Sequence, residues 1–482
     1  MKETLCIIIL LTLLALPSFY GTAQTFDKKG INNYVKTEMQ TEKIPGLAYA
    51  VVMNGKIIDT GAYGLANVEL HSPVTLHTKF AVGSIGKTFT ATAVMLLVKE
   101  GKLHLEDPIT MYLDSLPDSW KAITIRRLLS HTSGIKDYVE DFPGYSLIEK
   151  ASRQKEYTES EYIHMASELP LNFSPGEKWA YSNSNFVLLG FIVHKVSGKT
   201  LPEFMKEYVF GPLGMKETVY MTQTDIILNR AHGYTLNNKG DLINGSYISD
   251  FFSSTGDIGV TTTVIDMAKW SLALDSGKVL DKTTLSEMWS PSVLNNGASI
   301  DYGLGWRLSI YRGHKECGHG GYFKNGYAAS YFRYPEYNLS VVILTNQHHA
   351  DVRTLWHSFA GFYVPALTPV NRMKPVADGD TSLVKEANLL IREIKTNSLD
   401  TSLVTQGFKE RLDSTVQSAI ANDTTRFTIT YISSDLFANN LTVHGVPVEK
   451  ISYFKVHFET REDVYFSLYL TAGKKISDWV FY

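Results

Sequence analysis

The stretch AVGSIGKT, residues 81–88, holds side chains whose types and spacing could perform two different kinds of chemistry. As G-x-x-x-x-G-K-[ST], it would be a loop whose backbone amides and lysine bind the phosphates of a nucleotide. As S-x-x-K, it would place a serine nucleophile one helical turn before a lysine, here Ser84 and Lys87. The rest of the chain has to decide between these two interpretations.

Two features of the stretch argue against the nucleotide interpretation. Its template requires glycine at position 81, where the chain has Ala81. Such a loop also follows a buried strand, and the preceding LHTKF is a poor strand sequence. We therefore favour the serine–lysine interpretation.

The serine–lysine pair has the properties that acyl transfer requires. At the start of a helix, Ser84 and Lys87 share one face. A serine hydroxyl is a weak nucleophile until a nearby base takes its proton. A lysine serves as that base where burial favours its neutral form, and the apolar run TATAVMLLVKEG after Ser84 predicts a helix buried on nearly every side. The amide of Ser84 at the helix N-terminus could also donate to a developing oxyanion.

Two later stretches carry further candidate residues. FSPGEKWAYSNSNFVLLG places Tyr181 and Asn183 just before a predicted helix, and RGHKECGHGGYFKNGY places His319, Gly320 and Gly321 near the edge of a predicted strand. Together with ITIRRLLSHTSGI and YVFGPLGMKET, these stretches resemble the serine β-lactamase and penicillin-binding protein superfamily. The resemblance is to its branch of class C β-lactamases, D-alanyl-D-alanine carboxypeptidases, D-aminopeptidases and esterases, and covers about residues 26–362.

The resemblance implies a role for each residue of the first two motifs. Ser84 would be the acylated nucleophile, and Lys87 would act as the general base or assist it. Tyr181 is similar to the tyrosine that passes a proton to the leaving group. Asn183 would bind both the substrate amide and Lys87.

The third motif departs from that of many β-lactamases, which have Lys-Thr-Gly where this chain has His319, Gly320 and Gly321. The resemblance implies an oxyanion hole made by the amides of Ser84 and Tyr322, and the two glycines suit a close approach of substrate to the backbone. The missing hydroxyl argues against efficient penicillin hydrolysis. If His319 binds a substrate carboxylate, it must do so as an imidazolium.

The third motif also contains a possible metal site, because His314, Cys317 and His319 fall within six residues. In a strand, however, residues 317 and 319 share a face and residue 314 points the other way. We therefore expect no metal and no organic cofactor, and interpret Cys317 as a small buried residue. His131 is expected to be a structural hydrogen-bonding residue.

The order of predicted elements indicates an α/β (α+β) fold. A helix is expected over 26–41, then two strands joined at Asn54-Gly55, then mostly helix and loop to about residue 300, and strands again from Leu304. This order predicts an antiparallel sheet flanked by helices, a mainly helical subdomain, and a small α+β C-terminal domain. The predicted division is a signal peptide at 1–23, a hydrolase domain at 24–364, a linker at 365–380 and a C-terminal domain at 381–482.

The bulk composition is that of an ordinary folded protein, with 44% hydrophobic residues, 20% charged residues and a formal net charge of -3. It gives no sign of nucleic-acid binding. Lys2, an apolar run and Gly21-Thr22-Ala23 predict a secretory signal peptide, although Glu3 leaves a retained membrane anchor open. Cleavage would leave one cysteine and hence no intramolecular disulfide, and no later segment is expected to span a membrane.

The sequence thus predicts a periplasmic or secreted bacterial serine hydrolase. Its substrate would be a small molecule or peptide, of cell-wall origin or otherwise, with an amide or ester bond: a D-amino-acid peptide, a β-lactam or an ester. The alternative is a penicillin-recognising sensor that is acylated without efficient turnover.

Overall fold

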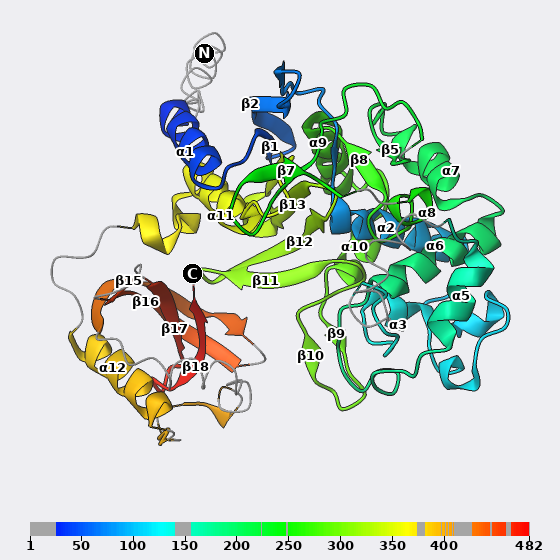
Figure 1. The fold of residues 1–482 in the computed structure, drawn as a ribbon. Helices are drawn as coiled ribbons and strands as arrows, with labels where there is room; N and C mark the ends of the chain where they lie inside the picture. The colour runs from blue at the N-terminus through cyan, green and yellow to red at the C-terminus, as the bar shows by residue number, and fades with distance from the viewer. Residues whose placement is uncertain are drawn as a thin grey trace, which may run out of the picture.

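The computed structural model describes residues 26–139, 156–222, 224–246, 249–373, 381–396, 398–400, 402, 404–406, 408, 427–443, 446–458 and 464–481. The predicted signal peptide, residues 1–23, lies outside the described residues, as do residues 374–380 of the predicted linker. In Figure 1 the C-terminal residues form a separate orange and red lobe beside a larger region that carries all three sequence motifs.

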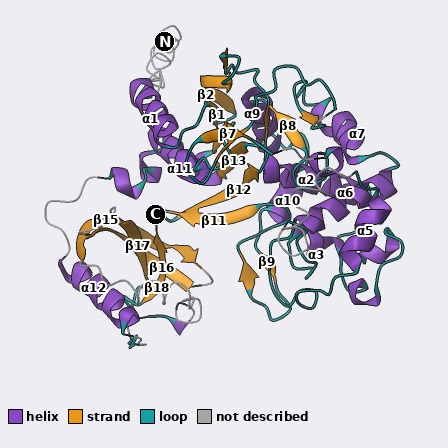
Figure 2. Ribbon diagram, viewed as in Figure 1, coloured by secondary structure: helices purple, strands orange, loops and turns teal. Residues whose placement is uncertain are grey.

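A seven-stranded antiparallel sheet forms the centre of the larger region (Figures 1 and 2). In spatial order its strands are β11 (Arg307–Tyr311), β12 (His314–Phe323), β13 (Tyr327–Tyr334), β14 (Leu339–Thr345), β1 (Gly46–Met53), β2 (Lys56–Asn67) and β3 (Ser72–Pro73). The N-terminal strand β1 pairs with β14, so that Leu47 lies opposite Thr345. The prediction that the two ends of a discontinuous α/β region share one sheet is confirmed.

The turn between β1 and β2 shows why Asn-Gly is a strong hairpin signal. Asn54 and Gly55 both have positive φ angles, 50° and 72°. Two consecutive residues of this kind match the right-handed twist of the flanking strands, and asparagine and glycine tolerate the conformation best.

The sheet buries both of its faces. Alternate residues of β1 belong to two hydrophobic cores: Ala48, Ala50 and Val52 on what we call the inner face, and Leu47, Tyr49 and Val51 on the outer face. The outer face is covered by α1 (Lys28–Thr41) and α11 (Val352–Tyr363), and α9 (Val264–Asp275) packs on the inner face.

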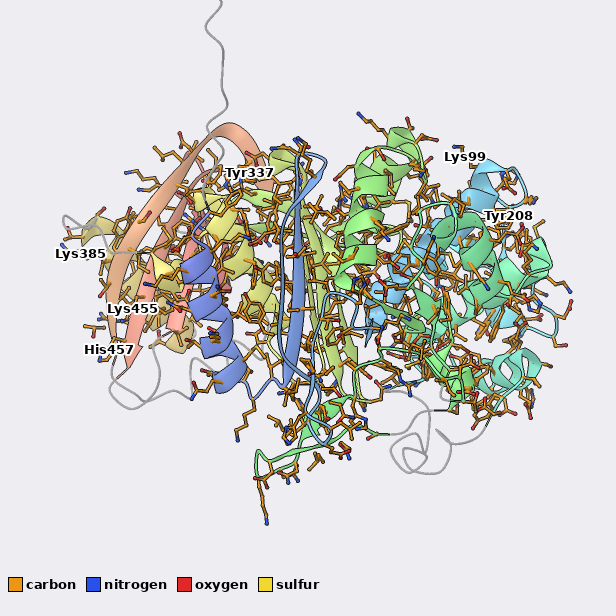
Figure 3. All side chains as sticks on the ribbon, turned by 90° about the horizontal axis from the view of Figure 1, so that it is seen from above. Lys99, Tyr208, Tyr337, Lys385, Lys455 and His457 are labelled. Atoms are coloured by element: carbon orange, nitrogen blue, oxygen red, sulfur yellow. The ribbon has the colours of Figure 1, made fainter. Side chains whose placement is uncertain are left out.

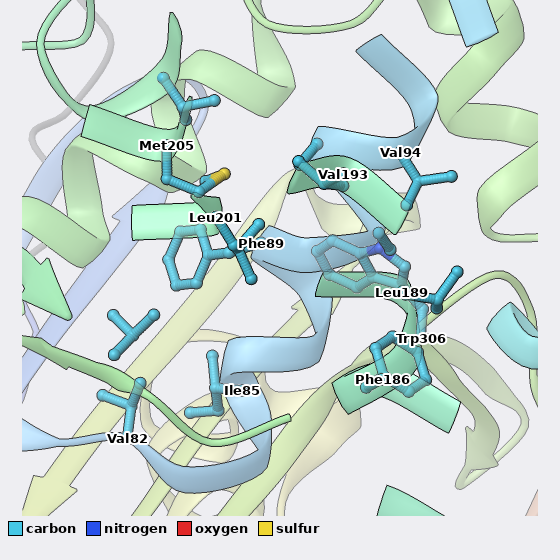
Figure 4. Close-up of a cluster of buried hydrophobic side chains, with 14 of the residues drawn as sticks. Val82, Ile85, Phe89, Val94, Phe186, Leu189, Val193, Leu201, Met205 and Trp306 are labelled. Atoms are coloured by element: carbon cyan, nitrogen blue, oxygen red, sulfur yellow. The ribbon is translucent and has the colours of Figure 1, made fainter. Parts of the chain in front are cut away.

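The helical subdomain lies beyond the inner face and is built around α2 (Gly86–Lys99) and α6 (Asn183–Ser197). Helix α2 is buried on nearly every side, as its sequence predicts. Figure 4 shows Phe89 and Val94 of α2 in one buried core with Leu189 and Val193 of α6. Further helices are α3 (Ile125–Leu129), α5 (Glu159–Ser167), α7 (Leu201–Met205), α8 (Asp250–Ser253) and α10 (Lys282–Met288), with a π-helical turn at Lys206–Phe210.

Short strands hold the segments around the helical subdomain. One small sheet has the order β4 (Phe80–Ala81), β8 (Val260–Thr262) and β5 (Val219–Tyr220), and two hairpins pair β6 (Tyr234–Leu236) with β7 (Leu242–Asn244) and β9 (Ser292–Val293) with β10 (Ser299–Ile300). The first of these sheets matters for the chemistry, because β4 leads directly into the stretch that contains Ser84.

The C-terminal region has the predicted helix and antiparallel meander. Helix α12 (Thr381–Lys395) packs its apolar face on a four-stranded sheet of β15 (Phe427–Val443), β16 (Val446–Phe458), β17 (Val464–Leu470) and β18 (Ile476–Phe481). Viewed from above, Lys455 and His457 of this sheet lie at one end of the molecule and Lys99 and Tyr208 at the other (Figure 3).

The tip of the β11–β12 hairpin contacts the C-terminal sheet. Arg312, 4% exposed, donates to Asp435 Oδ2 of β15 at 2.9 Å and to the Thr368 carbonyl at 2.9 Å. A Cβ at Gly313 would lie 2.2 Å from the ring of Phe437, so this position requires glycine. The first part of the predicted linker is packed rather than free, since Val370 is buried in a core shared with this sheet.

No helix within the described ranges is both long and apolar enough to cross a membrane.

Candidate active site

Ser84 lies in a 3₁₀ turn, Gly83–Ile85, that leads into α2. The turn is held on one side by the small sheet, where the Val82 amide donates to the Val260 carbonyl at 3.0 Å. On the other side it is pressed against β12: a Cβ at Gly83, whose φ is +51°, would lie 3.0 Å from the Tyr322 nitrogen. Gly83 is therefore required by both its conformation and its close neighbour.

Lys87 is completely buried and its ammonium group has a partner for each of its three N–H bonds. Nζ donates to Ser84 Oγ at 3.0 Å, to Asn183 Oδ1 at 2.7 Å and to the backbone carbonyl of Asp257 at 3.1 Å. All three acceptors are uncharged, so the cation is held by dipoles alone in a region without water contact. The distance to Ser84 Oγ is short enough for direct proton transfer.

The second motif meets the first at the start of α6. Asn183 is the first residue of that helix, and its amide oxygen reaches Lys87. The ring of Tyr181 lies with its centroid 4.9 Å from Lys87 Nζ and 4.3 Å from the ring of His131. Ser84, Lys87, Tyr181 and Asn183, chosen from the sequence, are thus brought together in space.

The third motif brings a second backbone amide beside Ser84. A Cβ at Gly321 would lie 1.9 Å from the Val82 carbonyl and 3.1 Å from the Ser84 nitrogen. That both glycines suit the approach of a substrate stays a prediction, and the structure adds a second reason for one of them. Gly321 is required by the turn that carries Ser84, whereas a Cβ at Gly320 would have no neighbour closer than 4.0 Å.

His319 is placed beside the site, in surroundings that disfavour the imidazolium that binding of a substrate carboxylate would require. Its side chain is buried, with Nδ1 2.6 Å from the Gly320 carbonyl and Nε2 3.2 Å from the Tyr302 hydroxyl. Burial holds the pKa of His319 well below its usual value, and the positive charges of Arg307 and Lys87 lower it further. A neutral ring with both nitrogens engaged is not a charged carboxylate anchor.

The partners of His131 fix the direction of a hydrogen-bond chain to His319. Nδ1 of His131 accepts from the Ser182 amide at 3.2 Å, which leaves the proton on Nε2, 3.2 Å from the Tyr302 hydroxyl. Tyr302 then donates to Nε2 of His319, whose Nδ1 proton faces the Gly320 carbonyl. His131 has the structural hydrogen-bonding role that the sequence predicts, and burial holds its pKa well below the usual value.

Arg307 is a charged residue of the site that sequence reasoning missed. It lies on the edge strand β11 with an exposed side chain, and its guanidinium carbon is 5.2 Å from the centroid of the Tyr181 ring. Within the part of the chain that the structure describes, no carboxylate forms an ion pair with it. No sequence signal could have selected it, because an arginine at the start of a strand is ordinary.

Two buried carboxylates near Lys87 were also missed. Asp137 accepts from Asn183 Nδ2 at 2.9 Å and from the Val139 amide at 3.0 Å, and burial raises its pKa to about 6. Asp257 accepts from the Tyr138 hydroxyl at 2.8 Å, and burial raises its pKa although Lys87 opposes the shift. The one available signal was the position of Asp137 two residues after LLSHTSGI.

The three residues considered for a metal site are engaged elsewhere. His314 Nδ1 lies 2.8 Å from Glu336 Oε2, and His319 is bound as described above. Cys317 is buried, as predicted, and burial raises the pKa of its thiol to about 12. A thiol this hard to ionise is a poor metal ligand.

Comparison with known proteins places these motifs in a family. The sequence model of the family described as Beta-lactamase matches residues 31–359. A penicillin-binding protein of Bacillus subtilis (strain 168) is 31% identical over 305 residues, which cover 61% of this chain and 66% of that protein. A D-aminopeptidase of Brucella anthropi is 27% identical over 323 residues, which cover 67% of this chain and 60% of that protein. The chain therefore spans less than two thirds of the length of either relative.

Solved structures give the same result. A penicillin-binding protein from Bacillus halodurans has a TM-score of 0.60 at 29% identity and covers 68% of this chain and 99% of its own. A D-amino acid amidase from Ochrobactrum anthropi SV3 has a TM-score of 0.57 at 25% identity, with 66% and 93% covered. An octameric penicillin-binding protein homologue from Pyrococcus abyssi, at 22% identity, shares the fold over 93% of this chain with a TM-score of 0.63. From the family match over 31–359, the chain belongs to the family described as Beta-lactamase, and the relatives above include a D-aminopeptidase and a D-amino acid amidase.

Proposed function

We propose that the protein is a secreted serine hydrolase that cleaves amide or ester bonds through an acyl-enzyme on Ser84. The observation that supports this most strongly is the contact of Lys87 Nζ with Ser84 Oγ, at 3.0 Å. Lys87 is buried, and its Nζ also donates to Asn183 Oδ1. A serine is activated by a base within hydrogen-bond reach, and the base in turn needs a group that orients it.

The chemistry uses groups of the chain at every step. Ser84 Oγ attacks the substrate carbonyl carbon and its proton passes to Lys87 in its neutral form. The amides of Ser84 and Tyr322 stabilise the oxyanion of the tetrahedral intermediate. As the carbon–nitrogen or carbon–oxygen bond breaks, the proton returns to the leaving group through Tyr181, and water then releases the acid from Ser84 by the reverse sequence.

Arg307 gives the proposal a substrate preference. With His319 neutral, the exposed guanidinium of Arg307 beside Tyr181 is the group suited to a substrate carboxylate. Trp179, 37% exposed, and Tyr322, 48% exposed, add aromatic surface for an apolar side chain. Because the chain is similar to hydrolases of D-amino acid derivatives, we infer that the substrates are short peptides that end in a D-amino acid with a free carboxylate, of the kind released from a bacterial cell wall outside the cytoplasm.

The nucleophile is tested by covalent labelling. A fluorophosphonate probe should label Ser84 in the full-length protein, and Ser84→Ala should abolish labelling. Ser182→Ala is the matched control, because Ser182 is a buried serine next to the site whose hydroxyl donates to the backbone carbonyl of Lys136 and not to a lysine side chain. An adduct located by mass spectrometry on Ser182 or Ser133 instead of Ser84 would contradict the proposal.

The substrate preference is tested with matched peptides. A peptide that ends in a free D-residue and its C-terminal amide should be compared in wild type and Arg307→Gln. Loss of a charge-assisted hydrogen bond should lower kcat/KM for the acid by about 10- to 100-fold and leave the amide within about threefold. Equal losses for both substrates would show that Arg307 is not the carboxylate anchor.

The same preparations distinguish the sensor alternative. Rapid turnover of a chromogenic ester identifies a hydrolase. A stoichiometric β-lactam adduct on Ser84 that persists for hours, without ester turnover, would instead identify a penicillin-recognising sensor.

A further inference from the structure

Asp137 lies behind the proposed nucleophile and touches neither Ser84 nor the Lys87 ammonium in the hydrogen bonds of the site. It sits in the loop after α3, is 4% exposed, and directs both carboxylate oxygens at Asn183. Asn183 Nδ2 donates to Oδ2 at 2.9 Å and to Oδ1 at 3.2 Å, and the backbone amide of Asn183 donates to Oδ1 at 3.2 Å. The helix that carries Asn183 is thereby held at its first residue.

From this geometry we propose that Asp137 is a positioning residue: as a carboxylate it fixes the Asn183 amide so that the amide oxygen, and not the nitrogen, faces Lys87. The inference rests on the proposed function, because it assigns to Asp137 the orientation of the base that activates Ser84. It adds a residue to the site that none of the three sequence motifs contains.

The two ends of the asparagine amide bind different partners. The oxygen, Oδ1, only accepts hydrogen bonds and the NH₂ group, Nδ2, only donates them, and the two are nearly equal in shape. Lys87 directs an N–H at Asn183 whether it is charged or, as the neutral base, turns its lone pair to Ser84, so this contact requires Oδ1. An ionised Asp137 offers only acceptors, so it requires Nδ2. The two contacts demand the same rotamer, and reversing the amide would break both and bring N–H groups against the ammonium.

Protonation of Asp137 removes one of the two contacts that fix the Asn183 rotamer, because Asp137 then no longer offers only acceptors. The protonated carboxyl group would carry an O–H donor, although its neighbours are themselves donors: the backbone amides of Val139 and Asn183, and Asn183 Nδ2. One of those donors would lose its acceptor, and the Asn183 amide could turn its oxygen toward Asp137. Lys87 would then lose its 2.7 Å contact, and with it the alignment toward Ser84.

The charged groups that face Asp137 among the described residues are Lys87 from α2 and Asp257 from the loop before β8. Burial raises the pKa of Asp137 to about 6, the hydrogen bonds from Val139 and Asn183 and the charge of Lys87 limit the rise, and the charge of Asp257 adds to it. The sign is therefore definite: the orienting carboxylate is present above about pH 6 and is lost as pH falls through that value.

The test is the pH profile of the full-length protein on a neutral chromogenic ester, for wild type and Asp137→Asn. An asparagine at 137 has one acceptor and one donor end, so it no longer dictates the orientation of Asn183. We expect kcat to fall about 10- to 100-fold at pH 7.5, KM to change less than threefold, and the acid limb of the wild-type profile to disappear or move by at least about one pH unit.

Two further variants serve as controls for the profile. Asp59→Asn replaces a buried carboxylate on the outer face of the sheet, and it should leave kcat and the acid limb unchanged while lowering thermal stability. Asp257→Asn removes the other carboxylate near Lys87. The Asp257 carboxylate accepts from Tyr138 and not from Asn183. If the acid limb disappears with Asp257→Asn and persists with Asp137→Asn, the inference is wrong.

A conservative variant keeps the test decisive if Asp137→Asn does not fold. Asp137→Glu retains the charge in a displaced position, and it should keep an acid limb with a reduced kcat. A Glu variant with wild-type kcat and no acid limb would overturn the inference. Fluorophosphonate labelling separates the two proposals: an unlabelled wild-type Ser84 refutes the proposed function, whereas labelled Ser84 with unchanged Asp137→Asn kinetics refutes only the role of Asp137.

Discussion

The two faces of the seven-stranded sheet bury carboxylates with opposite consequences. On the outer face, Asp59 accepts from Lys28 at 2.7 Å and from the hydroxyls of Tyr49 and Tyr363 at 3.1 and 2.7 Å. Burial alone would raise the pKa of Asp59, but these partners outweigh it and lower the value. Glu316, next to His357 on the same face, likewise has a lowered pKa in spite of its burial.

On the inner face the balance is reversed. Asp137 and Asp257 are as deeply buried, yet burial outweighs their partners and raises both pKa values. Their nearest cation, Lys87, donates to neutral acceptors instead of to either carboxylate side chain. Charge on the outer face stabilises the native state, whereas charge on the inner face costs stability, and groups destabilised in this way are concentrated at catalytic sites.

The largest expected effect comes from Lys87→Met. Removal of the base should lower kcat/KM for a neutral ester by about 10³-fold or more, because general-base catalysis contributes up to about four orders of magnitude. Stability should not fall, since an apolar side chain replaces a buried charge held by neutral groups. Steady-state kinetics and a thermal melt would check both expectations.

Lys28→Met is the matched variant on the outer face. It removes a lysine that pairs with a buried aspartate, so stability should fall while kcat/KM stays at the wild-type value. If Lys28→Met lowered kcat/KM as much as Lys87→Met, the buried charges of the two faces would not differ in their role in catalysis.

The next largest effect is the loss of stability in Asp59→Asn, about 2 kcal/mol at pH 7, because hydrogen bonds to a charged group are weakened. A carboxylate with a lowered pKa stabilises the native state above its unfolded pKa, near ~3.9, and this contribution is lost as pH falls through the lower native value. Denaturant melts should show a constant difference from wild type between pH 5 and 8, which shrinks below about pH 4. A difference that grows in acid would contradict this sign.

Asp137→Asn should change stability in the opposite direction. Because the native pKa is raised to about 6, the native state binds more protons than the unfolded state between about pH 4 and 6, and wild-type stability falls as pH rises through this window. The shift corresponds to about 3 kcal/mol, and lost hydrogen bonds offset part of it. We expect a variant about 1 kcal/mol more stable than wild type at pH 7 and close to it near pH 4. A variant that is about 2 kcal/mol less stable than wild type at pH 7 would show that Asp137, like Asp59, stabilises the native state as a carboxylate.

The smallest expected effect belongs to Asp435→Asn at the tip of the β11–β12 hairpin. Arg312 keeps its bond to the Thr368 carbonyl and its position over the Tyr453 ring, so the loss should be about 1 kcal/mol. Ester turnover should stay within about twofold of wild type. A tenfold loss of turnover would show that the hairpin tip controls the Tyr322 amide at the far end of β12.

Local sequence patterns predicted those parts of the molecule that local physics determines. Asn54-Gly55 specified a turn, the apolar run after Ser84 specified a buried helix, and the three motifs identified the residues that meet around Lys87. The protonation state of His319 could not be predicted in this way. The pKa of His319 is lowered by burial first and then by the charge of Arg307, and both arise only when β11 and the preceding loop have packed.

The same limit applies to the orientation of Asn183. Its partner Asp137 lies 46 residues away in the sequence, in a segment whose only local signal was a histidine motif. The proline-containing run after Val364 likewise had the composition of a free linker, yet Leu367 and Val370 are buried. Composition predicts a loop, but it does not predict which side chains of the loop are buried in a hydrophobic core.

The pairing of β1 with β14 has a consequence for the order in which the chain can fold. Met53 finds its partner Leu339 only after almost the whole hydrolase region has been synthesised. Contacts between such distant segments form slowly, because the chain must close a long loop before the contact stabilises it. During synthesis the N-terminal hairpin therefore has one unpaired edge and an incomplete core. A nascent chain therefore stays partly unfolded, with an exposed strand edge, until β14 has been synthesised.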